Sequence, residues 1–139
     1  MLKRNFLLCG SLGWCLEIFW TGMHSLLAGE ATMTGESSLL MFPIYGCAAL
    51  IKPVYKKIAA LPVFLRGSLY TGGIFLIEYI SGSILKYFHM CPWDYSSSPW
   101  QFHGVIRFDY APVWFFTGLF LKKYLRNHLE KSPRVLYYD

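Results

Sequence analysis

Two glutamates stand inside long apolar runs of the sequence, where a carboxyl group is costly to place. Glu17 lies within the run 5–27 and Glu78 within the run 64–85. A charged Arg, Lys or Asp at the centre of a bilayer costs about 2.5–3.5 kcal/mol on insertion scales. We therefore expect both acids to face the protein interior, where carboxyl groups bind cations, relay protons or act as general acid and base.

Further polar side chains are expected at the same depth. Glu78 precedes the outer end of its run by seven residues, so a rise of ~1.5 Å per residue places it roughly 10 Å below that end. Thr21 and His24 share a helical face with Glu17, because side chains three, four and seven residues apart align. The predicted ligand-binding residues are Glu17, Glu78, Tyr45, Asp109, Arg107, Tyr110, Thr21 and His24.

Apolar residues dominate the composition of the 139-residue chain. Hydrophobic residues make up 55% and charged residues 15%, against about 25% charged in ordinary soluble domains. Four apolar runs stand out, at 5–27, 39–51, 64–85 and 105–121. Three of them have close to the ~20 residues that a helix needs to cross a hydrocarbon core of ~30 Å, and the short second run can continue to Lys57. The sequence thus predicts an all-α integral membrane protein, a single domain over 1–139 with helices at about 5–27, 39–57, 64–85 and 105–125 and an outer loop at 86–104.

Positive charge alternates along the chain. Lys and Arg precede the first run, separate the second from the third and follow the fourth, whereas the connections 28–38 and 86–104 are nearly free of them. The positive-inside tendency then predicts four crossings with both termini cytoplasmic, in a multi-pass protein of the cell membrane. This asymmetry accounts for the pI of about 9.1, so a nucleic-acid partner is not required.

The two halves of the sequence share a loose pattern. "GWCLEIFWTG" and "GGIFLIEYISG" each place a glutamate between glycines, and each is followed by a loop and then by "MFPIYG" or "DYAP". Two helical hairpins of the same orientation would form a parallel repeat, as in some transporters. An internal duplication is one hypothesis for this likeness. The alternative is that the similar hydrophobic composition of the two halves produces it.

The outer loop "HMCPWDYSSSPWQFHG" is the most distinctive segment. Its prolines bar a regular helix, and its tryptophans and tyrosine suit a membrane interface. One interpretation is a folded loop that rests on the lipid headgroups. The other is a lid over the two acids, with Trp93, Asp94 and Tyr95 as the lid residues. The spacing of His89, His103 and Cys91 matches no standard metal motif, so neither a metal nor a cofactor is expected.

These segments together resemble a known family. "CPWDYS", "IEYISG", "GVIRFDYAPVWFFTG", "GWCLEIFWTG" and "MFPIYG" are similar to the transmembrane protein 229 family and to its bacterial relatives, the ABC-transporter type IV or CmpB-like permeases. The resemblance covers roughly residues 10–122. It implies a small multi-helix membrane protein and assigns no catalytic or binding residue.

Three functions fit the sequence. The favoured hypothesis is a permease or transport subunit with an outward-facing acidic cavity for a cation or polar solute. The alternatives are an intramembrane enzyme that acts on a lipid headgroup, and a scaffold or accessory protein. The chain has no G-x-x-x-x-G-K-[ST] motif, so an ATPase would be a separate protein. The other expected partners are the lipid bilayer and either further copies of the chain or a partner membrane subunit.

Overall fold

A computed structural model describes residues 2–129 and is predominantly helical, apart from one short hairpin. The basic residues Lys131 and Arg134, which contribute to the predicted cytoplasmic tail, lie outside the described residues. The elements are α1 (Leu2–Leu27), α2 (Met41–Gly46), the 3₁₀ segment η1 (Cys47–Leu50), α3 (Ile51–Ile58), α4 (Val63–Tyr87), β1 (Gln101–Phe102), β2 (Ile106–Arg107), the 3₁₀ segment η2 (Phe108–Tyr110) and α5 (Ala111–Leu129).

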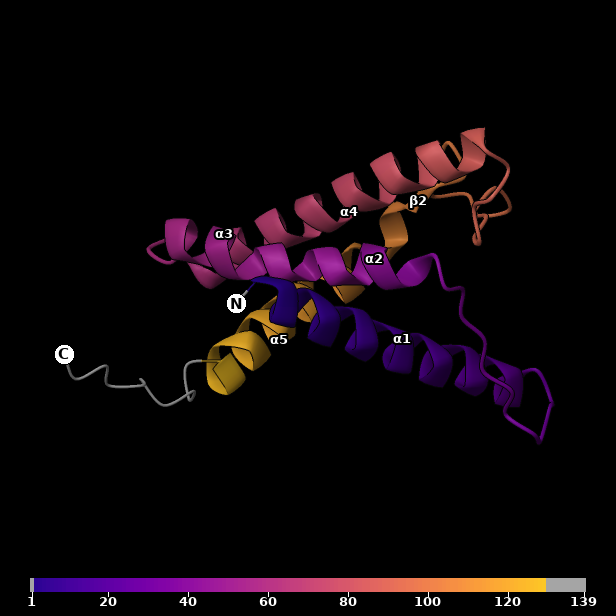
Figure 1. The fold of residues 1–139 in the computed structure, drawn as a ribbon. Helices are drawn as coiled ribbons and strands as arrows, with labels where there is room; N and C mark the ends of the chain where they lie inside the picture. Colours follow the sequence, from indigo (N-terminus) through magenta and orange to yellow (C-terminus); the bar gives the residue numbers. More distant parts are fainter. Residues whose placement is uncertain (1, 130–139) are drawn as a thin grey trace.

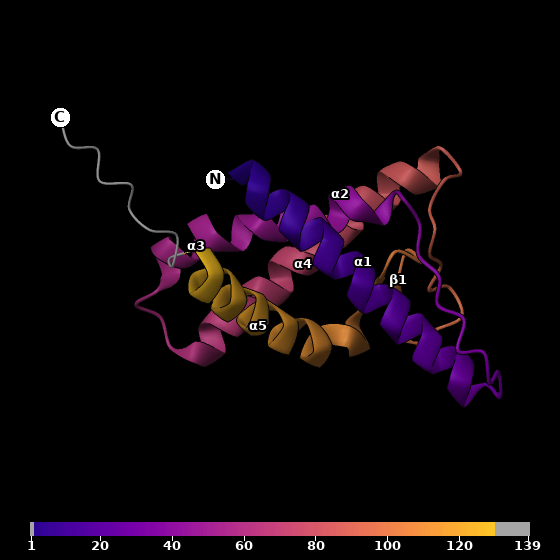
Figure 2. The same cartoon turned by 60° about the horizontal axis from the view of Figure 1, so that its bottom comes forward.

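The helical segments run back and forth along one axis (Figures 1 and 2). The start of α1, the connection 59–62 and the end of α5 lie at one end, which we term the basic end. The segments 28–40 and 88–110 lie at the other end, which we term the loop end. In both views α1 and α4 diverge toward the loop end.

Charge is separated along the axis. None of the described residues in the half toward the basic end is Asp or Glu, whereas Glu30, Glu36, Asp94 and Asp109 lie at the loop end. Lys86 and Arg107 are the basic residues described at the loop end. The basic residues described in the opposite half are Lys3, Arg4, Lys52, Lys56, Lys57, Arg66, Lys122, Lys123 and Arg126.

The helices α1 and α4 are long and apolar enough to cross a membrane. Only 17% of the most apolar 18-residue window of each helix is buried within the protein. Large apolar side chains therefore cover their outer faces, such as Phe19 at 66% exposed and Leu76 at 59%. Since the core helix of a soluble protein would be mostly buried, this pattern favours lipid as the surrounding medium.

The second predicted helix, 39–57, forms a rod from residue 41 to residue 58 that tightens at its centre. The backbone stays right-handed helical at Gly46, Leu50 and Ile51, and the N–H of Ile51 donates to the carbonyl of Ala48. Pro53 lacks the N–H that would bond the carbonyl of Ala49, and its ring crowds that carbonyl. A stretch with i→i+3 bonds accommodates the proline without breaking the rod.

The last helix begins at Ala111, six residues later than the sequence pattern predicts. His103 and Gly104 have φ of 52° and 69°, and these left-handed residues turn the chain into the β1–β2 hairpin, in which Gln101 pairs with Arg107. Pro112 is the second residue of α5, where a missing N–H costs no helical bond. Arg107, Asp109 and Tyr110 therefore precede the helix.

Glycines allow the helices of each hairpin to approach closely. Between α1 and α2, Phe42 covers Gly10, Tyr45 covers Gly13, and Phe6 covers Gly46. Between α4 and α5, Phe115 covers Gly67, and Tyr70 covers Gly118. Each hairpin thus buries an aromatic ring of one helix on a glycine of the other, in both directions. The internal duplication stays a prediction that this shared arrangement favours.

The core lies between the helices in the half toward the basic end. The buried residues Cys9, Ala49, Ile51, Tyr70, Leu121 and Leu125 form one cluster, which Phe6, Leu12, Ala48, Ile58, Leu119 and Tyr124 border. It joins α1, the rod 41–58, α4 and α5. The segment 28–40 instead runs back along α1, where Trp14 Nε1 donates to the carbonyl of Ser38 at 3.0 Å.

We predict that Gly118→Ala destabilises the protein by about 1–3 kcal/mol, because a Cβ at this position would lie 2.5 Å from the Cβ of Tyr70 and overpacks the helix contact. Thermal unfolding in mild detergent measures the change. Gly73→Ala is the control, since nothing lies within 4 Å of a Cβ there and alanine favours a helix by up to about 1 kcal/mol. Equal effects of the two substitutions would contradict the packing role of Gly118.

Candidate functional site

The outer loop folds tightly against the loop end of α4. Trp93 packs on Gly82, and its Nε1 donates to the carbonyl of Val105 at 2.9 Å. The amide of Tyr95 donates to the carbonyl of Gly104 at 2.9 Å. Lys86 Nζ donates to the carbonyl of His103 at 3.1 Å. Hydrogen bonds within the loop and contacts with Gly82 and Lys86 of α4 therefore hold the loop in place.

The three predicted lid residues have different positions. Trp93 holds the outer loop on α4 through its contact with Gly82 and its hydrogen bond to Val105. Asp94 is exposed and accepts hydrogen bonds from the amide and hydroxyl of Ser96, which lower the pKa of its carboxyl group. Tyr95 points inward. Burial, followed by the charge of Glu78, raises the pKa of the Tyr95 hydroxyl, so this hydroxyl stays protonated and can donate a hydrogen bond.

Glu17 lies half-buried on α1, against the returning segment 28–40. The hydroxyl of Ser37 donates to Glu17 Oε2 at 2.8 Å. The hydroxyl of Tyr45, from α2, interacts electrostatically with the carboxyl group of Glu17. The hydroxyl of Tyr95 and the carboxyl group of Glu78 act on it more weakly. The ring of Tyr45 rests on Gly13, and that contact positions the hydroxyl beside Glu17.

Glu78 lies on α4 and faces the first turn of α5. Its Oε2 is buried and has no hydrogen-bond partner among the described residues, and the same holds for Nε1 of Trp114. The two groups lie close enough to interact, although their arrangement does not meet the geometry of a hydrogen bond. A buried carboxyl oxygen and a buried indole N–H are thus left without hydrogen-bond partners among the described residues.

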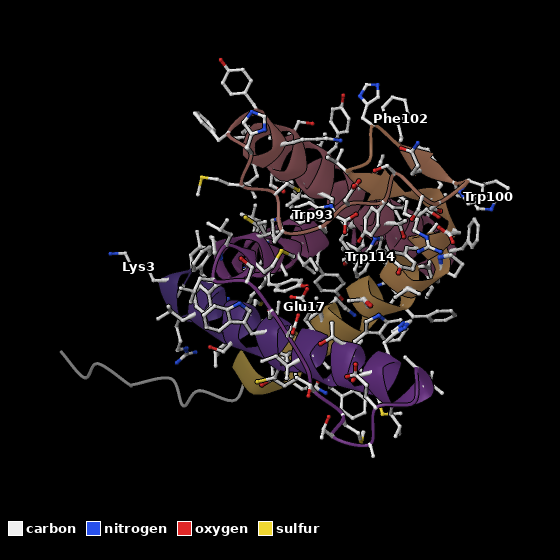
Figure 3. The ribbon with its side chains drawn as sticks, turned by 90° about the vertical axis from the view of Figure 1, so that its right-hand side faces the viewer. Lys3, Glu17, Trp93, Trp100, Phe102 and Trp114 are labelled. Carbon is white, nitrogen blue, oxygen red and sulfur yellow. The ribbon has the colours of Figure 1, made fainter. Side chains whose placement is uncertain are left out.

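Together these residues form what we term the acidic–aromatic cluster. Its members are Glu17, Tyr45, Glu78, Tyr95, Tyr110 and Trp114. The hydroxyls of Tyr45 and Tyr95 each interact with both glutamates. Seen from the loop end, Glu17 and Trp114 lie toward the middle of the protein, whereas Lys3, Trp100 and Phe102 lie at its edge (Figure 3).

Arg107 borders the cluster but carries its own counter-ion. Its Nε donates to both carboxylate oxygens of Asp109, at 2.8 and 3.0 Å. Its guanidinium also lies 4.7 Å from the ring centre of Tyr110, whose ring meets those of Tyr95 and Trp114 edge-on. Asp109 therefore neutralises Arg107, and the carboxyl groups of Glu17 and Glu78 remain as the acidic groups of the cluster.

Two predicted site residues have other surroundings. Thr21 holds the segment 28–40 on α1, because its hydroxyl donates to the carbonyl of Glu17 at 2.9 Å and accepts from the amide of Glu36 at 2.8 Å. His24 is exposed, and its ring lies 5.3 Å from that of Trp20. It shares a helical face with Glu17, but α2 covers only the first half of α1, so the structure does not bring His24 into the cluster.

Sequence reasoning missed Ser37 and Trp114. Trp114 follows Tyr110 by four residues, a spacing that places both side chains on one face of a helix, and this signal could have identified it. Ser37 has no such signal, since a serine in a loop has no periodicity. Its contact with Glu17 depends on the return of 28–40 along α1.

We predict that Trp93→Phe loosens the outer loop, because the buried carbonyl of Val105 loses its donor. An unsatisfied buried acceptor costs about 1–3 kcal/mol, so amide exchange around residues 93–107 should accelerate about fivefold or more. Hydrogen–deuterium exchange with mass spectrometry measures it. Trp100→Phe, in the same loop but at a 62% exposed side chain, should leave exchange unchanged. Equal acceleration in both variants would contradict the anchoring role.

The comparisons with known proteins agree with the resemblance of the sequence segments. The family described as "Putative ABC-transporter type IV" matches residues 4–138 of the chain. No solved structure matches the chain. The match extends over nearly the whole sequence and includes every residue of the acidic–aromatic cluster. The chain therefore belongs to this family of ABC-transporter type IV proteins.

Proposed function

We propose that the chain is a four-crossing membrane subunit of a transport assembly, and that its acidic–aromatic cluster binds a cation or a polar solute with a positive group. The description of its family as an ABC-transporter type supports the transport context. The observation that carries the proposal is the buried Oε2 of Glu78, which has no hydrogen-bond partner among the described residues, together with the likewise unpartnered N–H of the neighbouring Trp114.

The lengths of the helical segments support four crossings. The helices α1 and α4 contain 26 and 25 residues, and the rod 41–58 and α5 are shorter. At 1.5 Å per residue, and 2.0 Å in the 3₁₀ centre, the rod spans about 29 Å and α5 about 28 Å. Both lengths approach the ~30 Å of a hydrocarbon core. The basic end would then face the cytoplasm.

Four crossings predict which residues a membrane-impermeant maleimide reaches. In a background without the native cysteines, Ser97→Cys in the outer loop should react on intact cells, because Ser97 is exposed at the loop end. Lys57→Cys is equally exposed, but it lies at the basic end and should react only after permeabilisation. Mass-shift labelling measures both. Reaction of Lys57→Cys on intact cells would contradict the cytoplasmic basic end.

The cluster has the chemistry that a cation requires. The carboxyl oxygens of Glu17 and Glu78 can accept a positive group, and the faces of Tyr95, Tyr110 and Trp114 attract cations within about 6 Å of a ring centre. The burial of Glu78 Oε2 strengthens these attractions, because charges interact more strongly where the local dielectric is low. The position of Arg107 over Tyr110 illustrates the affinity of such a ring for a positive group.

The energy for transport would come from a partner. Because the chain contains no phosphate-binding loop of the G-x-x-x-x-G-K-[ST] type, we infer a separate ATPase subunit that meets the basic end. Four helices also offer little room for a transport path. Further copies of the chain or a partner membrane subunit would complete it.

We predict that Glu78→Gln abolishes flux of the solute through reconstituted protein and lowers its affinity about tenfold or more, because a charge-assisted contact is worth about 1.5–3 kcal/mol. Thermal stabilisation by monovalent metal ions and small alkylammonium ions identifies the solute, and liposome flux then tests the variant.

The substitution preserves side-chain shape, so the protein should remain folded. Glu36→Gln is the matched control, since Glu36 is an exposed acid of the other loop and should leave affinity and flux unchanged. Normal flux in folded Glu78→Gln would overturn the proposal.

A further inference from the structure

The segment 28–40 returns along the loop-end half of α1 before α2 begins (Figure 1). Its residues 33–38 are in no helix or strand, and we term them the return segment. Three successive residues of the return segment bond side chains of α1. The bonded pairs are Glu36 with Thr21, Ser37 with Glu17 and Ser38 with Trp14, at 2.8, 2.8 and 3.0 Å. The return segment therefore follows α1 as far as Trp14.

Glycines hold the return segment close to the backbone of α1. A Cβ at Gly22 would lie 2.8 Å from the carbonyl oxygen of Met33. A Cβ at Gly35 would collide with the carbonyl oxygen of Ile18. A side chain at either glycine would push the two backbones apart. The return segment is therefore packed on α1 as part of the fold.

The return segment reaches membrane depth in the four-crossing arrangement proposed above. Glu17 precedes the outer end of α1, at Leu27, by ten residues, which is about 15 Å at 1.5 Å per residue. The whole helix is about 39 Å long, and a hydrocarbon core is about 30 Å thick. Even if the excess of about 9 Å lay entirely beyond the core at the loop end, Glu17 would lie about 6 Å inside the core. Ser37, which bonds Glu17, lies at this depth too.

The backbone of the return segment has polar groups that hydrocarbon cannot satisfy. The amides of Gly35, Ser37 and Ser38 donate to no group among the described residues. Non-helical backbone occurs at membrane depth only where protein buries it or where it lines a water-filled cavity. Glu36 and Ser37 are exposed, so the described part of the chain does not bury the return segment. Water is the medium that satisfies these amides.

The two sides of α1 differ at the depth of Glu17. Phe19 follows Glu17 by two residues, which places it on the opposite side of the helix, and it is 66% exposed. Glu36, on the side of the return segment, is exposed and forms no ion pair among the described residues. An unpaired carboxylate is costly to bury in lipid or in protein. The side of Phe19 therefore suits lipid, whereas the side of Glu36 suits water.

The return segment leads to the acidic–aromatic cluster. Ser37 donates to Glu17 Oε2, and Glu17 interacts with the hydroxyl of Tyr45, on which Glu78 also acts. An acid at the entrance, Glu36, and an acid at the inner end, Glu17, give this route a negative potential. Such a potential raises the local concentration of cations and repels anions.

We propose that a water-filled path along the return segment admits the solute from the outer solution to Glu17, and that the solute is a small hydrophilic cation. The inference rests on the proposed function, because it supplies the route to the cluster and narrows the class of solute. A lipophilic cation would reach the cluster from the bilayer and would not need a polar route. Glu36 attracts the hydrated cation, and Glu17, Ser37 and Tyr45 offer it the first oxygen atoms of the cluster.

Cysteine labelling in a background without the native cysteines tests the path. On intact cells, Ser37→Cys should react with a membrane-impermeant cationic methanethiosulfonate at a rate within about tenfold of that of Ser97→Cys in the outer loop. Phe19→Cys is the matched control, since it lies at a similar depth on the apolar side of α1. A thiol in apolar surroundings stays protonated, so Phe19→Cys should react at least about 100-fold more slowly. Equally slow labelling at both positions would overturn the path, whether lipid or a partner subunit covers the return segment.

The charge of the reagent tests the class of solute. Rates at Ser37→Cys are divided by those at Ser97→Cys, which removes the intrinsic reactivity of each reagent. The cationic reagent should then be favoured at least about fivefold over an anionic methanethiosulfonate, and Glu36→Gln should reduce this preference. Equal normalised rates for the two reagents would overturn the cation assignment.

Amide exchange of the wild-type protein in lipid nanodiscs gives a measurement without substitutions. The amides of Gly35, Ser37 and Ser38 should exchange at least about 100-fold faster than the helical amides around Glu17. Equal protection of both sets would overturn the path.

Failure of this proposal and of the transport proposal can be told apart. Rapid labelling of Ser37→Cys together with normal flux in Glu78→Gln would refute the binding role of Glu78 and support the path. Slow labelling of Ser37→Cys together with lost flux in Glu78→Gln would refute the path and support that role.

Discussion

The arrangement of this protein depends on the close approach of helices at glycines. Lipid chains are as apolar as leucine, so helices in a bilayer associate through packing and polar contacts and not through hydrophobic burial. A ring that rests on a glycine gains dispersion contacts along its whole face and fixes the helix register. The same contacts fix the acidic–aromatic cluster. Tyr45 is held in place on Gly13, and the outer loop is held in place by Trp93 on Gly82.

Much of the fold could be predicted from the sequence, since the responsible properties are local. The apolar runs give the helices 2–27 and 63–87 to within a few residues of the predicted limits, and the alternation of charge gives two ends of different character. The start of α5 could not be predicted, because it depends on the left-handed turn at His103 and Gly104 and on the pairing of Gln101 with Arg107. These are interactions across a turn that hydropathy does not report.

The site was predictable to the extent that it follows helical periodicity. The cost of burying a carboxylate in lipid indicates that Glu17 and Glu78 face inward, and in the structure both act electrostatically on the hydroxyls of Tyr45 and Tyr95. Periodicity misleads at His24, because α1 continues beyond the helix that covers it. Tertiary contacts place Ser37 and Trp114, and their roles emerge only when the path of the chain in space is known.

The unequal lengths of the helices have a consequence for the surrounding bilayer. In the proposed four-crossing arrangement α1 is about 39 Å long and α5 about 28 Å, so a bilayer of one thickness would not match both. Hydrophobic mismatch of this kind is relieved when long helices tilt and when lipid thins around short ones. The splay of α1 and α4 toward the loop end supplies the tilt. Around α5 the bilayer would then be thinner than around α1.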